Sequence, residues 1–225
     1  MTGHHPPGSR PYLVPDLKEA TTVFACDAFG VRVADTLQRL QRRLPTVAAG
    51  PSLLCDLRDA RPLVLASGRP ESALSERLDR WAHDRGVPFL PVTIEQPQLV
   101  VGPFVVPGES ACHACYERRV RQHDRAAGSS AQLRIAYEQD AALRPAGWLP
   151  GLADLAAVLV AATLQGHPAG LRAGELRTVD TLTLQPSTGE VTGFTGCPRC
   201  DAEPTGSRSW SALADAWPLL SGVGR

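Results

Sequence analysis

Four of the six cysteines in this 225-residue sequence form two Cys-x-x-Cys pairs that could bind one metal ion. They are Cys112 and Cys115 in Cys-His-Ala-Cys, and Cys197 and Cys200 in Cys-Pro-Arg-Cys. A tight turn within each pair can direct two sulfurs inward, and two such turns complete a tetrahedral set of thiolate ligands. Soft ligands in this geometry favour zinc. We therefore expect a closed structural zinc site that ties the middle of the chain to its C-terminal part.

Other roles for the cysteines remain open. One pair could be a redox dithiol, which would make the chain a redox or metal-sensor protein with exchangeable thiols. The two pairs could also be unrelated turns. The remaining Cys26 and Cys55 lie in apolar surroundings, where cysteine behaves as a small hydrophobic residue. We expect both to be core residues, because a thiol nucleophile needs a neighbouring base or cation.

The composition is that of a folded globular chain, with 43% apolar and 20% charged residues. The 23 basic and 23 acidic residues balance, so neither nucleic acid nor an anionic membrane surface is expected as a partner. The longest apolar stretch, residues 152–164, contains Asp154 and is too short to cross a membrane. The first residues lack the pattern of a secretory signal, which predicts a cytoplasmic, reducing location where disulfides are disfavoured.

Strand and helix patterns alternate through the first half of the chain. Apolar runs predict buried strands at residues 21–26, 61–67 and 88–92. Apolar side chains at helical spacing predict helices at residues 31–44 and 71–85, and the first helix should bury Val33, Leu37, Leu40 and Leu44. A short turn, Asp27-Ala28-Phe29-Gly30, joins the first strand to the first helix. This alternation is typical of a wound α/β sheet.

Shorter segments dominate the second half. Two strands broken at Gly102-Pro103 are expected within residues 99–108, and helices at 116–125 and 152–164. Residues 128–147 are expected to be mobile apart from a short helix at 133–143. A strand at 177–184, a turn at 187–190 and a returning strand at 191–194 lead to the second cysteine pair. This organisation predicts an extended arm (1–20), one domain with the zinc site (21–202) and a C-terminal tail (203–225).

The order of these pieces resembles the ThiF-like superfamily, the adenylating enzymes related to ubiquitin activators. The resemblance covers residues 21–201 and is most specific where Gly102-Pro103-Phe104-Val105-Val106-Pro107-Gly108 leads into the first cysteine pair. It implies an α/β fold: a Rossmann-like ThiF-type sheet with helices on both faces, plus a zinc-tethered C-terminal β-segment. Together with the apolar helix at 152–164, it also predicts a two-fold homodimer.

Within the superfamily, the chain is most similar to the ocin-ThiF partner proteins of azol(in)e and thiopeptide gene clusters. This resemblance implies a non-catalytic domain that presents a ribosomal precursor peptide to a YcaO-type cyclodehydratase, which converts Cys, Ser or Thr into thiazoline or oxazoline rings. Many such partners carry an N-terminal winged-helix module that binds the leader peptide, and the proline-rich residues 1–20 cannot form one. The chain is therefore expected to bind peptide through its own surface, to rely on a separate leader-binding protein, or to act as a scaffold.

Asp27, Ala28, Phe29 and Gly30 stand where catalytic members of the superfamily have a glycine-rich phosphate loop. Two of these residues carry side chains where bare backbone would approach phosphate, and Asp27 adds a negative charge. Lys18, the only lysine, precedes the sheet, and Asp56 is a weak counterpart of the ribose-binding acid. No catalytic residue is assigned, and ATP is not expected to bind in the family's mode. The alternative is an adenylating enzyme that activates a carrier-protein or peptide carboxylate.

The predicted helix after the first cysteine pair is strongly basic. Its cationic residues are Arg118, Arg119, Arg121 and Arg125. A solvated helix face explains such a run without any ligand. The sharper hypothesis is a surface that binds acidic residues of the precursor peptide or of the cyclodehydratase.

Overall fold

The computed structural model describes residues 21–41, 46–48, 62–140, 142–145 and 147–200. The predicted arm (1–20) and tail (203–225) lie outside the described residues, as do Lys18, Cys55 and Asp56.

One mixed sheet forms the centre of the described chain. Its strands are β1 (Thr22–Ala25), β2 (Thr46–Ala48), β3 (Leu63–Ser67), β4 (Phe89–Glu95), β5 (Gln98–Val101), β6 (Glu175–Asp180) and β7 (Pro186–Glu190). They lie in the order β2-β1-β3-β4-β5-β6-β7. The first four are parallel and the last three are antiparallel to their neighbours. The sheet therefore ends in the β6-β7 hairpin, and the chain that leaves β7 leads to the second cysteine pair.

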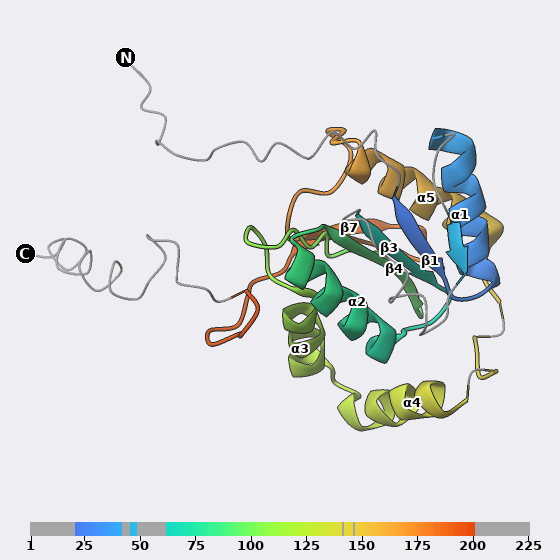
Figure 1. The fold of residues 1–225 in the computed structure, drawn as a ribbon. Helices are drawn as coiled ribbons and strands as arrows, with labels where there is room; N and C mark the ends of the chain where they lie inside the picture. The colour runs from blue at the N-terminus through green and yellow to red at the C-terminus, as the bar shows by residue number, and fades with distance from the viewer. Residues whose placement is uncertain (1–20, 42–45, 49–61, 141, 146, 201–225) are drawn as a thin grey trace, which may run out of the picture.

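Helices cover both faces of this sheet, as the sequence predicts. They are α1 (Ala28–Gln41), α2 (Ser72–Arg85), α3 (His113–His123), α4 (Ala127–Gln139) and α5 (Pro150–Leu164). Figure 1 shows α1 and α5 on one face, and α2 and α3 on the other. Each face has its own apolar core, because β1 and β3 are buried along their whole length and pack on both sides. No helix in the described part of the chain is long and apolar enough to cross a bilayer.

Helix α1 begins three residues earlier than predicted. The carboxylate of Asp27 accepts a hydrogen bond from the backbone N–H of Gly30 at 3.0 Å, which caps the helix and turns the predicted Asp27–Gly30 turn into its first turn. Val33 and Leu37 are fully buried, as predicted. The prediction for Leu40 is wrong: it lies near the end of the helix and is 50% exposed.

Three predictions for the second half are corrected. Strand β5 pairs with β4 in a hairpin, and after Gly102-Pro103 only Val105 forms a bridge, to Phe89. The strand predicted at 177–184 ends at Asp180, because that side chain accepts the backbone N–H groups of residues 182 and 183 and makes the turn there. The predicted turn at 187–190 is consequently strand β7, and the chain has left the sheet by 191–194.

The segment predicted to be mobile contains helix α4, which begins six residues before the predicted helix. None of its described side chains is buried, so apolar periodicity gave little sign of it. Arg69, which follows β3, holds this helix and the residues after it in place. The Arg69 guanidinium lies over the ring of Tyr137 and donates to the carbonyls of Asp140 (3.0 Å) and Leu143 (2.6 Å).

A close approach of α1 to β3 generates the first prediction. A Cβ at Gly30 would lie 2.2 Å from the carbonyl oxygen of Ala66, so Gly30→Ala must push the helix from the sheet. We expect the free energy of unfolding to fall by about 1–3 kcal/mol in a urea titration. Gly128→Ala in α4 is the matched control, because nothing lies within 4 Å of its added Cβ. This control should be neutral or slightly stabilising, and an equal loss in both variants would contradict the packing argument.

Candidate functional site

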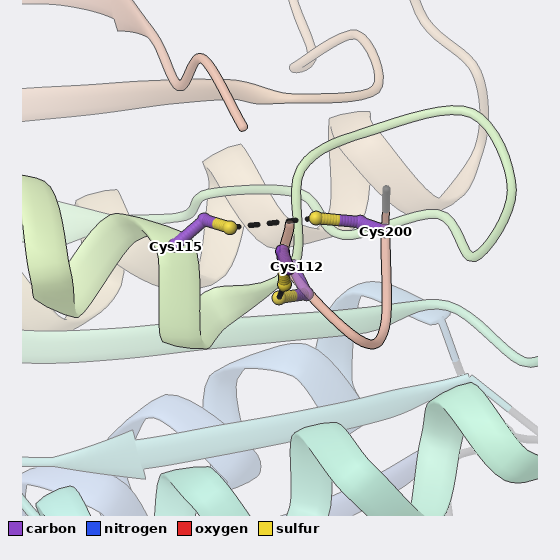
Figure 2. Close-up of side chains that lie close together, drawn as sticks. Cys112, Cys115 and Cys200 are labelled. Carbon is purple, nitrogen blue, oxygen red and sulfur yellow. Dashed lines mark hydrogen bonds between the residues drawn. The ribbon is translucent and has the colours of Figure 1, made fainter. Parts of the chain in front are cut away.

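The four paired cysteines meet in one cluster, as the sequence predicts. Cys112 immediately precedes α3 and Cys115 lies in its first turn, whereas Cys197 and Cys200 lie on the loop that follows β7. The sulfurs of Cys112 and Cys197 are 3.7 Å apart, and those of Cys115 and Cys200 are 3.4 Å apart. Figure 2 shows the Cys115 and Cys200 sulfurs directed toward each other beside Cys112.

All four ligand sulfurs lie within 4.8 Å of one another, so they could hold a single metal ion. Tetrahedral coordination with metal–sulfur bonds of about 2.3 Å places sulfurs about 3.8 Å apart, which matches the observed separations. The donor set is entirely thiol, the class that soft or borderline metals prefer. Four residues from two distant segments could therefore supply all four ligands of one tetrahedral ion.

The electrostatics of the cluster favour a bound cation. Burial raises the pKa of Cys112 above its ordinary value and that of Cys200 to about 12. For Cys197, burial is outweighed by hydrogen bonds from the backbone N–H groups of Arg199 and Cys200, which lower its pKa to about 7. The backbone N–H of Phe194 also donates to the Cys115 sulfur at 3.4 Å. Since several thiolates this close repel one another, a metal cation would stabilise the ionised set.

An ion pair between α2 and the second cysteine loop supports this cluster, and the sequence analysis missed it. Arg199, inside Cys-Pro-Arg-Cys, forms salt bridges with Asp79 and with Glu76. Asp79 is completely buried and also accepts the backbone N–H of His113 at 3.1 Å. One carboxylate thus contacts both segments that supply the cysteines. The sequence feature that could have indicated this ion pair is the position of Asp79 on the apolar face of α2, near Leu78 and Ala82.

Some arginines of the predicted basic surface contact the loop that carries the second cysteine pair. The guanidinium groups of Arg118 and Arg119 lie 4.6 and 4.0 Å from the ring centroid of Phe194. Arg119 also donates to the backbone carbonyls of residues 192 and 193, each at 3.3 Å. Arg121 pairs with Glu117 within α3, and Arg125 is exposed beyond the end of that helix. Two of the four arginines are thus packed against the cysteine loop.

The predicted degenerate loop lies at the carboxyl ends of β1 and β3. Besides capping α1, the carboxylate of Asp27 accepts the backbone N–H of Gly68 at 2.8 Å. Phe29 is fully buried and makes an edge-to-face contact with Trp148, with ring centroids 5.4 Å apart, whereas Ala28 is exposed. The carboxylate therefore occupies backbone donors at a helix N-terminus, the kind of position that binds phosphate in nucleotide-binding folds.

Cys26, predicted to be a core residue, is half-buried at the end of β1. Burial raises the pKa of its thiol to about 12, with further contributions from the charges of Glu71 and Asp27. A thiol in this environment is protonated near neutral pH and is a poor nucleophile.

No family model and no curated protein matches the sequence. Several solved structures share its fold. The heterocyclase TruD superposes with a TM-score of 0.58 at 19% identity, over 84% of this chain and 28% of that one. A heterocyclase in complex with substrate and cofactor gives 0.56 at 17% identity, over 83% and 25%. E. coli MccB with succinimide gives 0.57 at 14% identity, over 84% and 68%.

These comparisons confirm the predicted ThiF-type α/β fold with helices on both faces of the sheet. The chain spans about a quarter of the length of the two heterocyclase chains and about two thirds of MccB.

The Arg199 ion pair generates a prediction about stability. Arg199→Ala leaves the buried carboxylate of Asp79 without its cation, and we expect a loss of about 3 kcal/mol in the free energy of unfolding. Arg80→Ala is the control, because it removes an exposed cation from the same Glu76 and should cost no more than about 0.5 kcal/mol. Denaturant titration measures both. Similar values for the two variants would show that Asp79 does not depend on Arg199.

Proposed function

We propose that this chain is a non-catalytic ThiF-like partner subunit. In this role it binds or presents a ribosomal precursor peptide to a YcaO-type cyclodehydratase during the synthesis of a modified peptide. The fold shared with the heterocyclase TruD, and with a heterocyclase bound to its substrate and cofactor, supports this function. The residues of this chain correspond to about a quarter of each of those heterocyclase chains.

The observation that carries the non-catalytic part of the proposal is the position of the Asp27 carboxylate. It already accepts the backbone N–H groups of Gly30 and Gly68, so a phosphate at this helix terminus would have to displace it. Two unit charges about 4 Å apart repel by about 4 kcal/mol at an effective dielectric near 20. This repulsion corresponds to about a thousandfold in affinity and argues against ATP bound in the family's mode.

The second candidate function is an adenylating enzyme that activates a peptide or carrier-protein carboxylate. The shared fold of E. coli MccB, which has also been solved with ATP, favours this alternative. The two functions differ in where ATP is used. An adenylating enzyme transfers the AMP of ATP to its carboxylate substrate and releases pyrophosphate without the cyclodehydratase, whereas a partner subunit acts only together with the cyclodehydratase.

A reconstitution with the precursor and cyclodehydratase from the same gene cluster tests the proposed function. Adding this chain should increase ring formation, which mass spectrometry follows as the loss of one water per ring. Calorimetry of the chain alone with ATP and magnesium should give no saturable binding, because Asp27 occupies the phosphate donors. Pyrophosphate release by the isolated chain, or ring formation that is independent of it, would contradict the proposal.

We also assign zinc to the four-cysteine cluster, and expect one ion per chain. Cys200→Ser should lose the metal and melt at a lower temperature, because a closed zinc site contributes directly to folding. Metal analysis and thermal melting are the measurements. Cys26→Ser is the control and should keep the zinc, since Cys26 lies outside the cluster.

Thiol titration separates the zinc assignment from a redox role. The four clustered thiols should be shielded until a chelator is added. Freshly purified protein without zinc, or with the cluster thiols freely reactive, would refute the assignment.

A homodimer remains part of the proposal. Leu155 and Val158 on α5 are 38% and 50% exposed, although the other side of this helix is buried against α1 and the sheet. A second copy would cover these side chains. Light scattering should return twice the 24.0 kDa mass of one chain, and Val158→Glu should halve that mass. A monomer at high concentration would rule out the dimer.

A further inference from the structure

We propose that the precursor peptide docks as an added strand on the free edge of β7, in the groove between that edge and α3. The proposed occupant is an extended peptide segment that alternates acidic and apolar residues. This inference rests on the proposed function and specifies the surface and the binding mode. Three features of the structure support it.

The first feature is a strand edge that no other described strand pairs with. β7 is the last strand in the sheet order, and all five of its residues are exposed. Two backbone hydrogen bonds flank the pairing of β6 with β7. The N–H of Asp180 donates to the carbonyl of Gln185, and the N–H of Val191 donates to the carbonyl of Gly174. Because hydrogen-bonded pairs alternate along an antiparallel ladder, Ser187 and Gly189 face β6.

The alternate residues of β7, namely Pro186, Thr188 and Glu190, therefore turn their backbone groups outward. Pro186 has no N–H to leave unpaired, as suits an edge strand. The outward N–H and C=O groups of Thr188 and Glu190 remain as the template for another strand, and strand addition is an established mode of peptide recognition.

The second feature is a groove of about 530 Å3 beside this edge. Val120 of α3, Leu176 of β6 and Val191 give it an apolar floor. A side chain at residue 189 would pack on Leu176, since a Cβ there would lie 3.8 Å from the leucine side chain. Because residue 189 is glycine, this surface of Leu176 has no such cover. An apolar side chain of an added strand can occupy this space and bury the leucine surface.

The third feature is the charge of the groove wall. Arg119 and His123 line the groove from α3, whereas Arg121, which pairs with Glu117, and Arg125 lie outside its lining. Glu190 is the acidic residue of the lining. Arg119 is held rigidly by Phe194 and the carbonyls of the cysteine loop, so this cation stays at the groove. An acidic segment complements such a wall, which would raise the encounter rate and fix the orientation of the peptide.

Fluorescence anisotropy with two labelled peptides of equal length tests this site on the full chain. One peptide alternates Glu and Val, and the other alternates Lys and Val. The acidic peptide should bind, more weakly as salt is raised, and the basic one should not. Thr188→Pro removes an outward donor and should weaken binding about tenfold, the effect of one lost hydrogen bond. Gly189→Val fills the space over Leu176 and should weaken it as well.

Arg80→Glu, an exposed charge reversal on α2, is the control and should leave the affinity unchanged. Unchanged melting temperature and zinc content exclude misfolding of the variants. An acidic peptide whose backbone amides are methylated along one edge should lose binding to the unaltered protein, which tests strand addition without any substitution.

Equal binding of the methylated and unmethylated peptides would overturn strand addition, as would unchanged affinity in both groove variants. A shift to a larger mass that Thr188→Pro abolishes would identify a second copy as the occupant and also overturn the inference. If the acidic peptide fails to bind while ring formation still requires this chain, the docking site is wrong and the proposed function stands.

Discussion

Bringing four sulfurs within 4.8 Å of one another requires the last described segment of the chain to return to the beginning of α3. The hairpin of β6 and β7, which pairs with β5, makes this return, and the loop after β7 carries the second cysteine pair. Asp79 and Arg199 secure the same junction from α2, through a carboxylate that has no contact with solvent. The antiparallel half of the sheet and the helices α2 and α3 are thus held together at one point. The face covered by α1 and α5 packs independently of it.

The cysteine cluster and the turn at Asp27 differ in chemical character. At the cysteine cluster, four thiols lie close enough together to hold a metal ion. At the carboxyl ends of β1 and β3, the chain supplies its own anion, since the Asp27 carboxylate bridges two backbone N–H groups. The cysteine cluster can thus accept a cation, whereas the backbone donors beside Asp27 are already occupied by a carboxylate.

The sequence predicted those parts of the fold that depend on local pattern or on a fixed spacing of ligands. The buried strands β1 and β3, the helix α2 and the cysteine cluster are of this kind. The features that it missed depend on single polar side-chain contacts, either within a turn or between distant segments. Asp180 ends β6 through its side chain, and Asp79 meets Arg199 from a segment 120 residues away. The first six residues of helix α4 were missed for a different reason, because this helix packs no apolar face against the core.

The exposure of α4 has a consequence for how chains with this sheet diverge. Between the end of α3 and the contacts of Arg69 with Asp140 and Leu143, the backbone crosses from one face of the molecule toward the other without filling core volume. Such a connection needs a minimum length to span the distance between its ends, but it has no strict maximum. Doubling it adds only about 0.6 kcal/mol of loop-closure entropy. Insertions, affinity tags or whole accessory modules can therefore enter the chain here without disturbing the sheet, the cysteine cluster or the β7 edge.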